Sequence, residues 1–367
     1  MPNNNLLFDT VKLGSITIDN RVGVAPMTRT SATPEGVATD EMVNYYAKFA
    51  RGGFSLIITE GTYPDDAYSQ GYFDQPGIIN DEQIKGWKKV TDAVHQEGGK
   101  IILQLMHAGA LSQGNRFVKD SIGPSVVEPK GEQMKVYGGN GKFPVPKEAT
   151  KEDIKVVIKG FAEAAKNAKK AGFDGVEIHG ANGYILDQFL TDYANKRTDE
   201  YGGTTENRVR LLVEVSEAVR EAVGKDYPVG IRISQGKIND YYHKWADKEK
   251  DAEIIFGQLG QAGLDFIHVT EFEAWQPAFS EGEGTGATLA ALAKKYSKLP
   301  VIANGSLHDP EKAKEIIEKG EADVITLGRG ALANHDWANK VKNGEQPDEF
   351  VPEKTLSPDA KIKGFEV

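Results

Sequence analysis

Eight short apolar runs recur along the chain, and each is followed by a longer segment. The runs are rich in β-branched residues, which is typical of strands that are buried on both faces. The segments between them repeat their apolar residues at helical spacing. The predicted strands are 22–27, 56–60, 101–105, 175–179, 229–233, 266–270, 301–304 and 324–327. The predicted helices are 81–97, 151–171, 206–223, 248–262, 288–296 and 310–319.

This alternation constrains the fold more than any other feature of the sequence. Eight strand–helix units predict a closed, parallel (β/α)8 TIM barrel more readily than the alternative, a doubly wound open sheet. A length of 367 residues fits one barrel with insertions, so we expect a single domain over 1–367. Two stretches fall outside the repeat. Residues 6–20 predict an N-terminal hairpin at the barrel bottom, and the Gly- and Pro-rich stretch 123–146, after the third strand, predicts a lid.

The composition excludes several classes of function. A net charge of −10 disfavours nucleic acids and anionic membranes as partners. The chain has no cysteine, which excludes disulfides, thiolate nucleophiles and cysteine-ligated iron–sulfur clusters, and we expect no metal site. No run approaches the roughly 20 apolar residues of a membrane helix. Residues 1–5 show no basic stretch leading into an apolar run, so we expect a cytoplasmic protein, and a homo-oligomer is compatible with the sequence.

Glycines and an arginine follow the last two predicted strands. The loops read Asn304-Gly305-Ser306 and Gly328-Arg329. In (β/α)8 barrels, phosphate sites form in the loops after strands seven and eight, and active sites lie at the carboxyl ends of the strands. Glycine lets backbone N–H groups approach an anion closely, and arginine offers a forked cationic partner. The plainer alternative is that these glycines serve only tight turns, but both loops together fit the rule for phosphate sites in (β/α)8 barrels.

Polar side chains also end the middle strands. Gln104 and Arg232 end strands three and five, where an amide and a guanidinium suit the polar edge of a heterocycle that gains negative charge. His179 and Asn182 follow strand four and offer two hydrogen-bond donors for a carbonyl or nitro oxygen. Tyr184 offers a phenolic proton. Each residue alone has a structural alternative, whereas their grouping at strand ends favours a catalytic site.

The sequence resembles the old yellow enzyme (NADH:flavin oxidoreductase) family over nearly its full length. The matching stretches occur in the family's order and include two long, specific blocks. They are 20–29, 57–62, 103–105, 179–190 (HGANGYILDQFL) and 197–208 (RTDEYGGTTENR). The resemblance implies non-covalent FMN, reduction by NADH or NADPH, and hydride transfer from flavin N5 to the β-carbon of an activated alkene, either an α,β-unsaturated carbonyl or a nitro compound.

The resemblance also implies a role for each candidate residue. His179 and Asn182 would bind the substrate oxygen, and Tyr184 would donate the proton. The FMN-binding set would be Pro26, Met27 and Thr28 under the isoalloxazine, Gly61 and Gln104 at its pyrimidine part, Arg232 at the N1–O2 edge, and Asn304, Gly305, Ser306, Gly328 and Arg329 at the phosphate. Thr28 would lie near the flavin C4 carbonyl and tune the redox potential.

Two stretches depart from the family pattern. The run 330–335 lacks the proline that often follows the Gly-Arg pair, and the aromatic loop 235–246 matches no pattern that we can assign. Larger relatives carry an iron–sulfur cluster, for which this chain lacks the cysteines, so we expect electrons to come directly from a nicotinamide. Two rival functions fit the sequence less well. A metal-dependent barrel hydrolase would need a His-x-His pair on the first strand, which is absent, and a non-catalytic flavin carrier would have no use for Tyr184.

Replacement of Arg329 tests the phosphate assignment. Arg329→Ala should weaken FMN binding by about 1.5–3 kcal/mol, the scale of a charge-assisted hydrogen bond. The measurement is the FMN dissociation constant of the apoprotein. Unchanged retention of FMN would show that the phosphate lies elsewhere.

Overall fold

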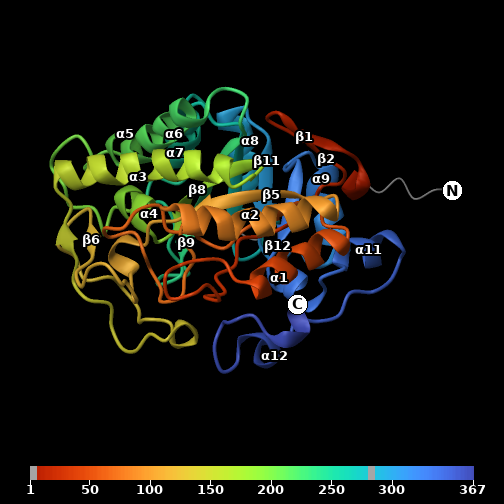
Figure 1. Ribbon diagram of the computed structural model, residues 1–367. Helices are drawn as coiled ribbons and strands as arrows, with labels where there is room; N and C mark the ends of the chain where they lie inside the picture. Colours follow the sequence, from red (N-terminus) through yellow and green to blue (C-terminus); the bar gives the residue numbers. More distant parts are fainter. Residues whose placement is uncertain (1–5, 280–285) are drawn as a thin grey trace.

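Eight parallel strands close into a barrel in the computed structural model, which describes residues 6–279 and 286–367. The ring order is β10-β11-β12-β3-β4-β5-β8-β9, so barrel strands that follow one another in the chain are neighbours. Figure 1 shows the barrel from the side, with labels on many of its elements. This confirms the predicted barrel and excludes the doubly wound sheet. The strands are β3 Val22–Val24, β4 Leu56–Ile58, β5 Lys100–Leu105, β8 Gly175–Asn182, β9 Val229–Lys237, β10 Phe266–Thr270, β11 Val301–Asn304 and β12 Val324–Leu327. The expectation about residues 1–5 lies outside the described residues.

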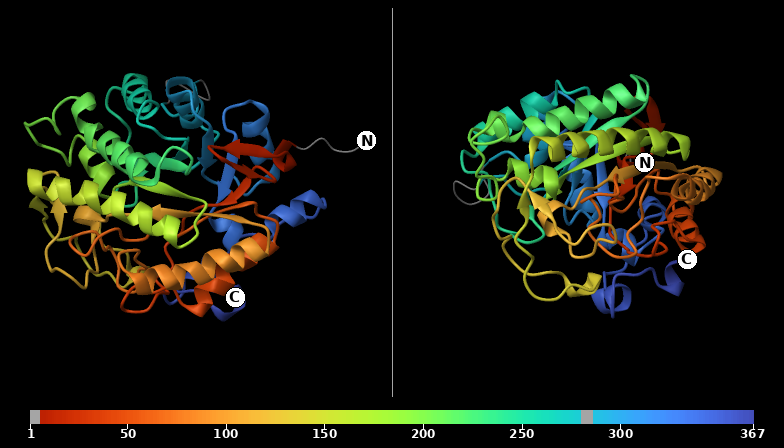
Figure 2. Two further views of the ribbon diagram at one scale, coloured as in Figure 1. Left: turned by 45° about the horizontal axis from the view of Figure 1, so that its top comes forward. Right: turned by 60° about the vertical axis from the view of Figure 1, so that its left-hand side comes forward.

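Helices surround this ring (Figure 2). The long helices are α1 Asp40–Arg51, α2 Asp81–Gln96, α3 Lys151–Lys170, α6 Arg210–Val223, α7 Glu249–Leu259, α8 Leu289–Ser297 and α9 Pro310–Glu318. The short ones are α4 Ile185–Leu190, α5 Thr205–Arg208, α10 Arg329–Ala333, α11 Trp337–Lys342 and α12 Pro352–Leu356, with 3-10 turns η1 Leu6–Phe8, η2 Gly109–Leu111, η3 Lys135–Tyr137 and η4 Gly364–Glu366. None of the helices in the described ranges has the length and apolar character that crossing a membrane requires.

The structure corrects two helix predictions. The predicted helix 206–223 is divided into α5 and α6, because a separate helix begins at Thr205, where the Thr204 side chain accepts the Asn207 N–H. Helix α1 was not predicted, although Met42, Tyr45 and Phe49 recur at helical spacing and are buried. Its acidic first turn and basic last turn also suit the helix dipole.

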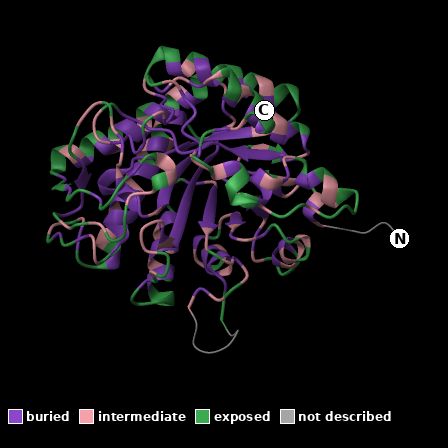
Figure 3. Ribbon diagram, turned by 90° about the horizontal axis from the view of Figure 1, so that it is seen from below, coloured by how far each residue is buried: buried purple, intermediate pink, exposed green. Residues whose placement is uncertain are grey.

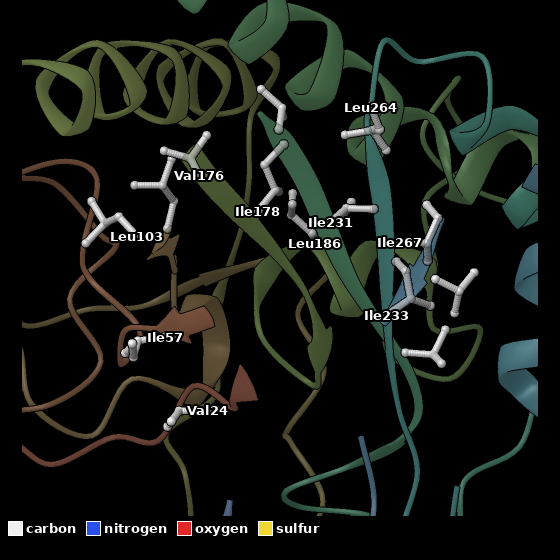
Figure 4. Packing of buried hydrophobic residues seen from close by; sticks show 14 of the residues in the cluster. Val24, Ile57, Leu103, Val176, Ile178, Leu186, Ile231, Ile233, Leu264 and Ile267 are labelled. Carbon is white, nitrogen blue, oxygen red and sulfur yellow. The ribbon is translucent and has the colours of Figure 1, made fainter. Parts of the chain in front are cut away.

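Alternate strand residues face the barrel interior and the helices. The helix-facing set includes Leu103, Ile178 and Ile231, which pack among buried residues outside the ring (Figure 4). The ribbons of the barrel strands are buried along most of their length (Figure 3). At the barrel bottom, the interior set is apolar. It consists of Leu56, Ile58, Ile102, Phe266, Ile302 and Val324, and it packs against Leu13 and Ile18 of the hairpin. Strands β1 Val11–Leu13 and β2 Ile16–Ile18 form that antiparallel hairpin, as predicted.

Strands β8 and β9 run beyond the predicted ends at 179 and 233. They stay paired as far as Asn182 and Lys237, with a shift of register between Gly180 and Asn182. The extension brings Asn182 into the ladder with a φ of 61°. Conversely, β3 and β4 end earlier than predicted, because residues 25–27 and 59–60 leave the regular ladder at the barrel mouth.

Two further segments reach the mouth of the barrel. The excursion 123–146 is closed at its base by a parallel pair, β6 Ile122–Gly123 and β7 Lys147–Glu148, and η3 lies within it. The C-terminal segment is fixed by Arg29, which donates to both carboxylate oxygens of Glu366 at 2.7 and 2.6 Å. Both side chains are buried, so this ion pair joins the end of the chain to the loop after β3.

A substitution in the hairpin should destabilise the barrel. Leu13 is fully buried against the interior layer, so Leu13→Ala should lower the free energy of unfolding by about 2–5 kcal/mol. The matched control is Lys12→Ala at an exposed position, which should change it by less than about 0.5 kcal/mol. Urea denaturation of both variants measures the difference, and equal midpoints would contradict the role of the hairpin.

Candidate functional site

An open cleft lies at the carboxyl ends of the barrel strands. Every site residue predicted from the sequence lines it. These are Pro26, Met27, Thr28, Gly61, Gln104, His179, Asn182, Tyr184, Arg232, Asn304, Gly305, Ser306, Gly328 and Arg329. They come from the ends of different strands and from the loops that follow, and barrel closure brings them together.

The two glycine-containing loops form one end of the cleft. Gly305 has a φ of 142°, and a Cβ there would lie 2.2 Å from the Glu271 carbonyl oxygen, so only glycine fits. Helix α10 begins at Arg329 despite the missing proline in 330–335. The Arg329 guanidinium lies 5.9 Å from the ring centre of Phe272, which also lines the cleft. This end offers backbone N–H groups and a cation, the requirements of a phosphate site.

Arg232 lies within the cleft as a buried cation. It donates from Nη2 to Asn304 Oδ1 at 2.8 Å, while its Nε is buried and has no hydrogen-bond partner among the described residues. Burial lowers the pKa of Arg232 to about 10, against the opposing effect of Glu177. A desolvated guanidinium with an unused donor fits a ligand that carries or develops negative charge, as the N1–O2 edge of a reduced flavin does.

His179 and Asn182 lie on the same extended strand. Burial first, and then the nearby Arg232 and His268, hold the pKa of His179 well below its usual range. Its Nδ1 is buried without a partner in the described part of the chain. Asn182 donates its backbone N–H to Ser234 Oγ of β9 at 2.8 Å, which fixes the strained backbone that presents its side chain. The strand therefore offers a neutral imidazole and an amide to the cleft.

Tyr184 precedes α4 and is paired with a second tyrosine. The hydroxyl oxygens of Tyr184 and Tyr72 lie 2.5 Å apart, and both side chains are buried. Burial raises the pKa of both phenols above the usual range. The Tyr72 ring also lies 4.8 Å from that of Tyr137 of the excursion. Sequence analysis missed Tyr72, because it lies 112 residues from Tyr184 and no local pattern links the two.

Other lining residues also escaped the sequence analysis. The wall also includes Arg29, Met106, Met134, Tyr137, Ile238, Glu271, Phe272, Leu332, Phe350 and Leu356, and with Met27 it is rich in thioether and aromatic groups. The aromatic loop 235–246 has two parts. Ile238 lines the cleft, whereas Trp245 is buried against Phe256 at a ring distance of 5.8 Å. The exposed Tyr241 and Tyr242 lie between them.

Comparison with known proteins gives a consistent result. The chain is 38% identical to a probable flavin mononucleotide-dependent alkene reductase of Leishmania infantum, over 93% of this chain and 91% of that protein. It is 34% identical to an NADH oxidase of Thermoanaerobacter brockii and to a metal reductase of Desulforamulus reducens, but it spans only about half their length, 51% and 50%. The structure of an old yellow enzyme homologue from Zymomonas mobilis matches with a TM-score of 0.86 at 31% identity, over 98% of both chains.

A sequence model of the NADH:flavin oxidoreductase / NADH oxidase family matches residues 6–348, which include all the strands and the whole set of predicted site residues. The fold and this match agree, and the chain belongs to the NADH:flavin oxidoreductase / NADH oxidase family.

Proposed function

We propose that the chain is an FMN-dependent alkene reductase that uses NADH or NADPH to reduce α,β-unsaturated carbonyl or nitro compounds. Membership of the family makes FMN the cofactor and a reduced nicotinamide the reductant. When bound, FMN supplies the two-electron chemistry that takes hydride from the nicotinamide and gives it to the alkene. One observation carries the proposal: the glycine loops, a buried arginine whose Nε has no partner among the described residues, and a buried tyrosine all line the same cleft.

The residues of the cleft divide into two groups in this proposal. Gln104, Arg232 and the loop 26–28 would hold the flavin ring, and the loops 304–306 and 328–329 would hold its phosphate. His179 and Asn182 would donate hydrogen bonds to the carbonyl or nitro oxygen of the substrate. That withdraws electrons from the double bond and makes its β-carbon electrophilic. A neutral histidine suits this task, because its N–H donates without adding a buried charge.

Tyr184 would deliver the proton to the α-carbon. Its phenol keeps its proton at neutral pH, because burial raises its pKa. The hydroxyl of Tyr72 is its hydrogen-bond partner and would orient it. As the phenol gives up its proton, the Tyr72 hydroxyl can donate to the phenolate oxygen that forms, which lowers the barrier to transfer.

The rival functions are distinguished by the family and by one experiment. Family membership sets aside the metal-dependent hydrolase. A non-catalytic flavin carrier would bind FMN and be bleached by NADPH under anaerobic conditions, yet it would not turn over an enone. The purified protein should be yellow, and cyclohexenone should reoxidise the reduced flavin. Bleaching without reoxidation would contradict the reductase proposal.

Substitution of the two tyrosines tests the protonation step. Tyr184→Phe should slow cyclohexenone reduction by about 10²–10⁴-fold, the usual worth of a general acid, while NADPH reduces the flavin at nearly the original rate. Tyr72→Phe should slow the same step less, because it removes only the partner of the acid. Stopped-flow measurement of both half-reactions separates the effects. A nitroalkene serves as control, because its nitronate product can be protonated in water, and equal losses in both half-reactions would indicate a structural role for Tyr184.

The buried histidine should also affect the pH dependence of stability. The pKa of His179 is lowered in the folded chain, whereas an unfolded histidine titrates near ~6.5. Below that pH the unfolded chain takes up a proton that the folded site refuses, so stability should fall as the pH drops from about 6.5. NMR of ring-labelled histidine should report a neutral His179 at pH 5.5, with the exposed His308 as reference. A charged His179 at that pH would contradict the prediction.

A further inference from the structure

A chain of buried polar side chains crosses the barrel interior behind the cleft. Gln104 donates from Nε2 to Glu177 Oε1 at 2.9 Å, and His268 Nδ1 lies 2.6 Å from Glu177 Oε2. His268 Nε2 lies 2.9 Å from Thr326 Oγ1. Because β8, β10 and β12 are not neighbours in the ring, these contacts run through the interior. Glu177, His268 and Thr326 have no solvent exposure.

This arrangement forms one of two adjoining interior layers. Glu177, His268 and Thr326 come from alternate strands, which is how a (β/α)8 barrel builds a layer. Gln104, Arg232 and Asn304 come from the other strands and line the cleft. Gln104 and Glu177 are Cα partners, as are Arg232 and His268, so each cleft residue adjoins a residue of the buried layer.

The buried carboxylate fixes the orientation of Gln104. A carboxylate can only accept, so the amide must turn its NH₂ group toward Glu177, and its carbonyl oxygen then lies on the other side. His268 orients the carboxylate in turn. Its Nδ1–H donates to Glu177, and its Nε2 accepts from the Thr326 hydroxyl. The donations from Thr326 through His268 and the donation from Gln104 therefore meet at the Glu177 carboxylate, which fixes the orientation of the Gln104 amide.

The Glu177 carboxylate also stabilises the positive charge of Arg232. Glu177 raises the pKa of Arg232 and of His268 against the effect of their burial. A buried carboxylate costs free energy, and an apolar side chain would suit the fold at this position, as it does in the layer below. The presence of Glu177 is therefore best explained by what it does for its two neighbours in the cleft.

We propose that Glu177, oriented by His268 and Thr326, is a positioning residue for the flavin, which fixes the Gln104 amide and offsets the charge of Arg232. This inference rests on the proposed function, since it requires FMN to lie against Gln104 and Arg232. Glu177 then sets two properties, the affinity for FMN and the reduction potential. Its negative charge disfavours the electron-rich reduced flavin, so loss of that charge should raise the potential.

The decisive variant is Glu177→Gln, which preserves shape and removes the charge. Either the oxygen or the NH₂ group of the new amide can face Gln104, so the orientation of the Gln104 amide is no longer fixed. We expect the FMN dissociation constant to rise about tenfold and the midpoint potential to shift upward.

The matched control is Asp251→Asn, which neutralises a buried carboxylate on α7 that accepts from Thr205 Oγ1 and the Asp247 N–H, away from the cleft. It should change neither quantity. The readouts are FMN titration of the apoprotein and potentiometric titration.

A second pair of variants decides the matter if Glu177→Gln does not fold. Thr326→Val removes only the last hydrogen bond of the chain, and Thr91→Val removes the equally buried bond from Thr91 Oγ1 to the Ala171 carbonyl oxygen. Thr326→Val leaves the charge of Glu177 in place and loosens its orientation, so it should raise the FMN dissociation constant, whereas Thr91→Val should not. A double substitution, Glu177→Gln with Gln104→Ala, should weaken FMN binding by less than the product of the single effects, because the two residues act together.

The outcomes are distinct. If the native protein binds FMN and reduces enones while Glu177→Gln equals it in affinity and potential, the inference is overturned and the proposed function stands. If Glu177→Gln loses as much thermal stability as Asp251→Asn but leaves the midpoint potential of the flavin unchanged, the inference is also overturned. If the native protein binds no FMN, both proposals fail.

Discussion

The closure of the strand ring decides what every inward-facing side chain must do. A closed barrel of eight strands has no water-filled lumen, so each interior group must find its partner inside. At the bottom the partners are apolar, and Leu13 of the hairpin completes them. Higher up they are polar, and Glu177 with His268 joins strands that do not touch. The interior turns from apolar to polar below the cleft, because Glu177 and His268 are buried beneath the residues that line it.

Sequence reasoning succeeded where the relevant signal is local. Strand periodicity predicted the barrel, and strand ends predicted the residues that line the cleft, because parallel closure brings such ends together. It failed where a partner is distant. The extension of β8 depends on pairing with β9, and the Glu177–His268 contact joins residues 91 positions apart. Glu177 lies in a run that reads simply as a buried strand. The missed helix α1 differs, since its periodic apolar residues and cap were visible.

The ion pair of Arg29 and Glu366 illustrates how distant segments form one site. Arg29 adjoins Thr28 of the cleft, and its guanidinium also donates to the Ala360 carbonyl oxygen at 2.8 Å. Two buried charges gain little net stability over apolar substitutes, but either one alone is costly. The pair therefore specifies where the C-terminal segment lies, and that segment contributes Leu356 to the cleft wall. The sequence alone gives no sign of this contact between residues 337 positions apart.

The methionine sulfur atoms in the cleft determine what kind of oxidative damage the protein can suffer there. Reduced flavins react with dioxygen and release hydrogen peroxide, which attacks sulfur. Three of the five methionines, Met27, Met106 and Met134, line the cleft, and the chain has no cysteine. Peroxide formed by a bound flavin would meet thioethers rather than a thiol. The damage is then methionine sulfoxide, which cellular reductases reverse, rather than an irreversibly oxidised cysteine. Ageing in air should accordingly appear as a repairable change in the polarity of the cleft wall, without cross-linking between chains.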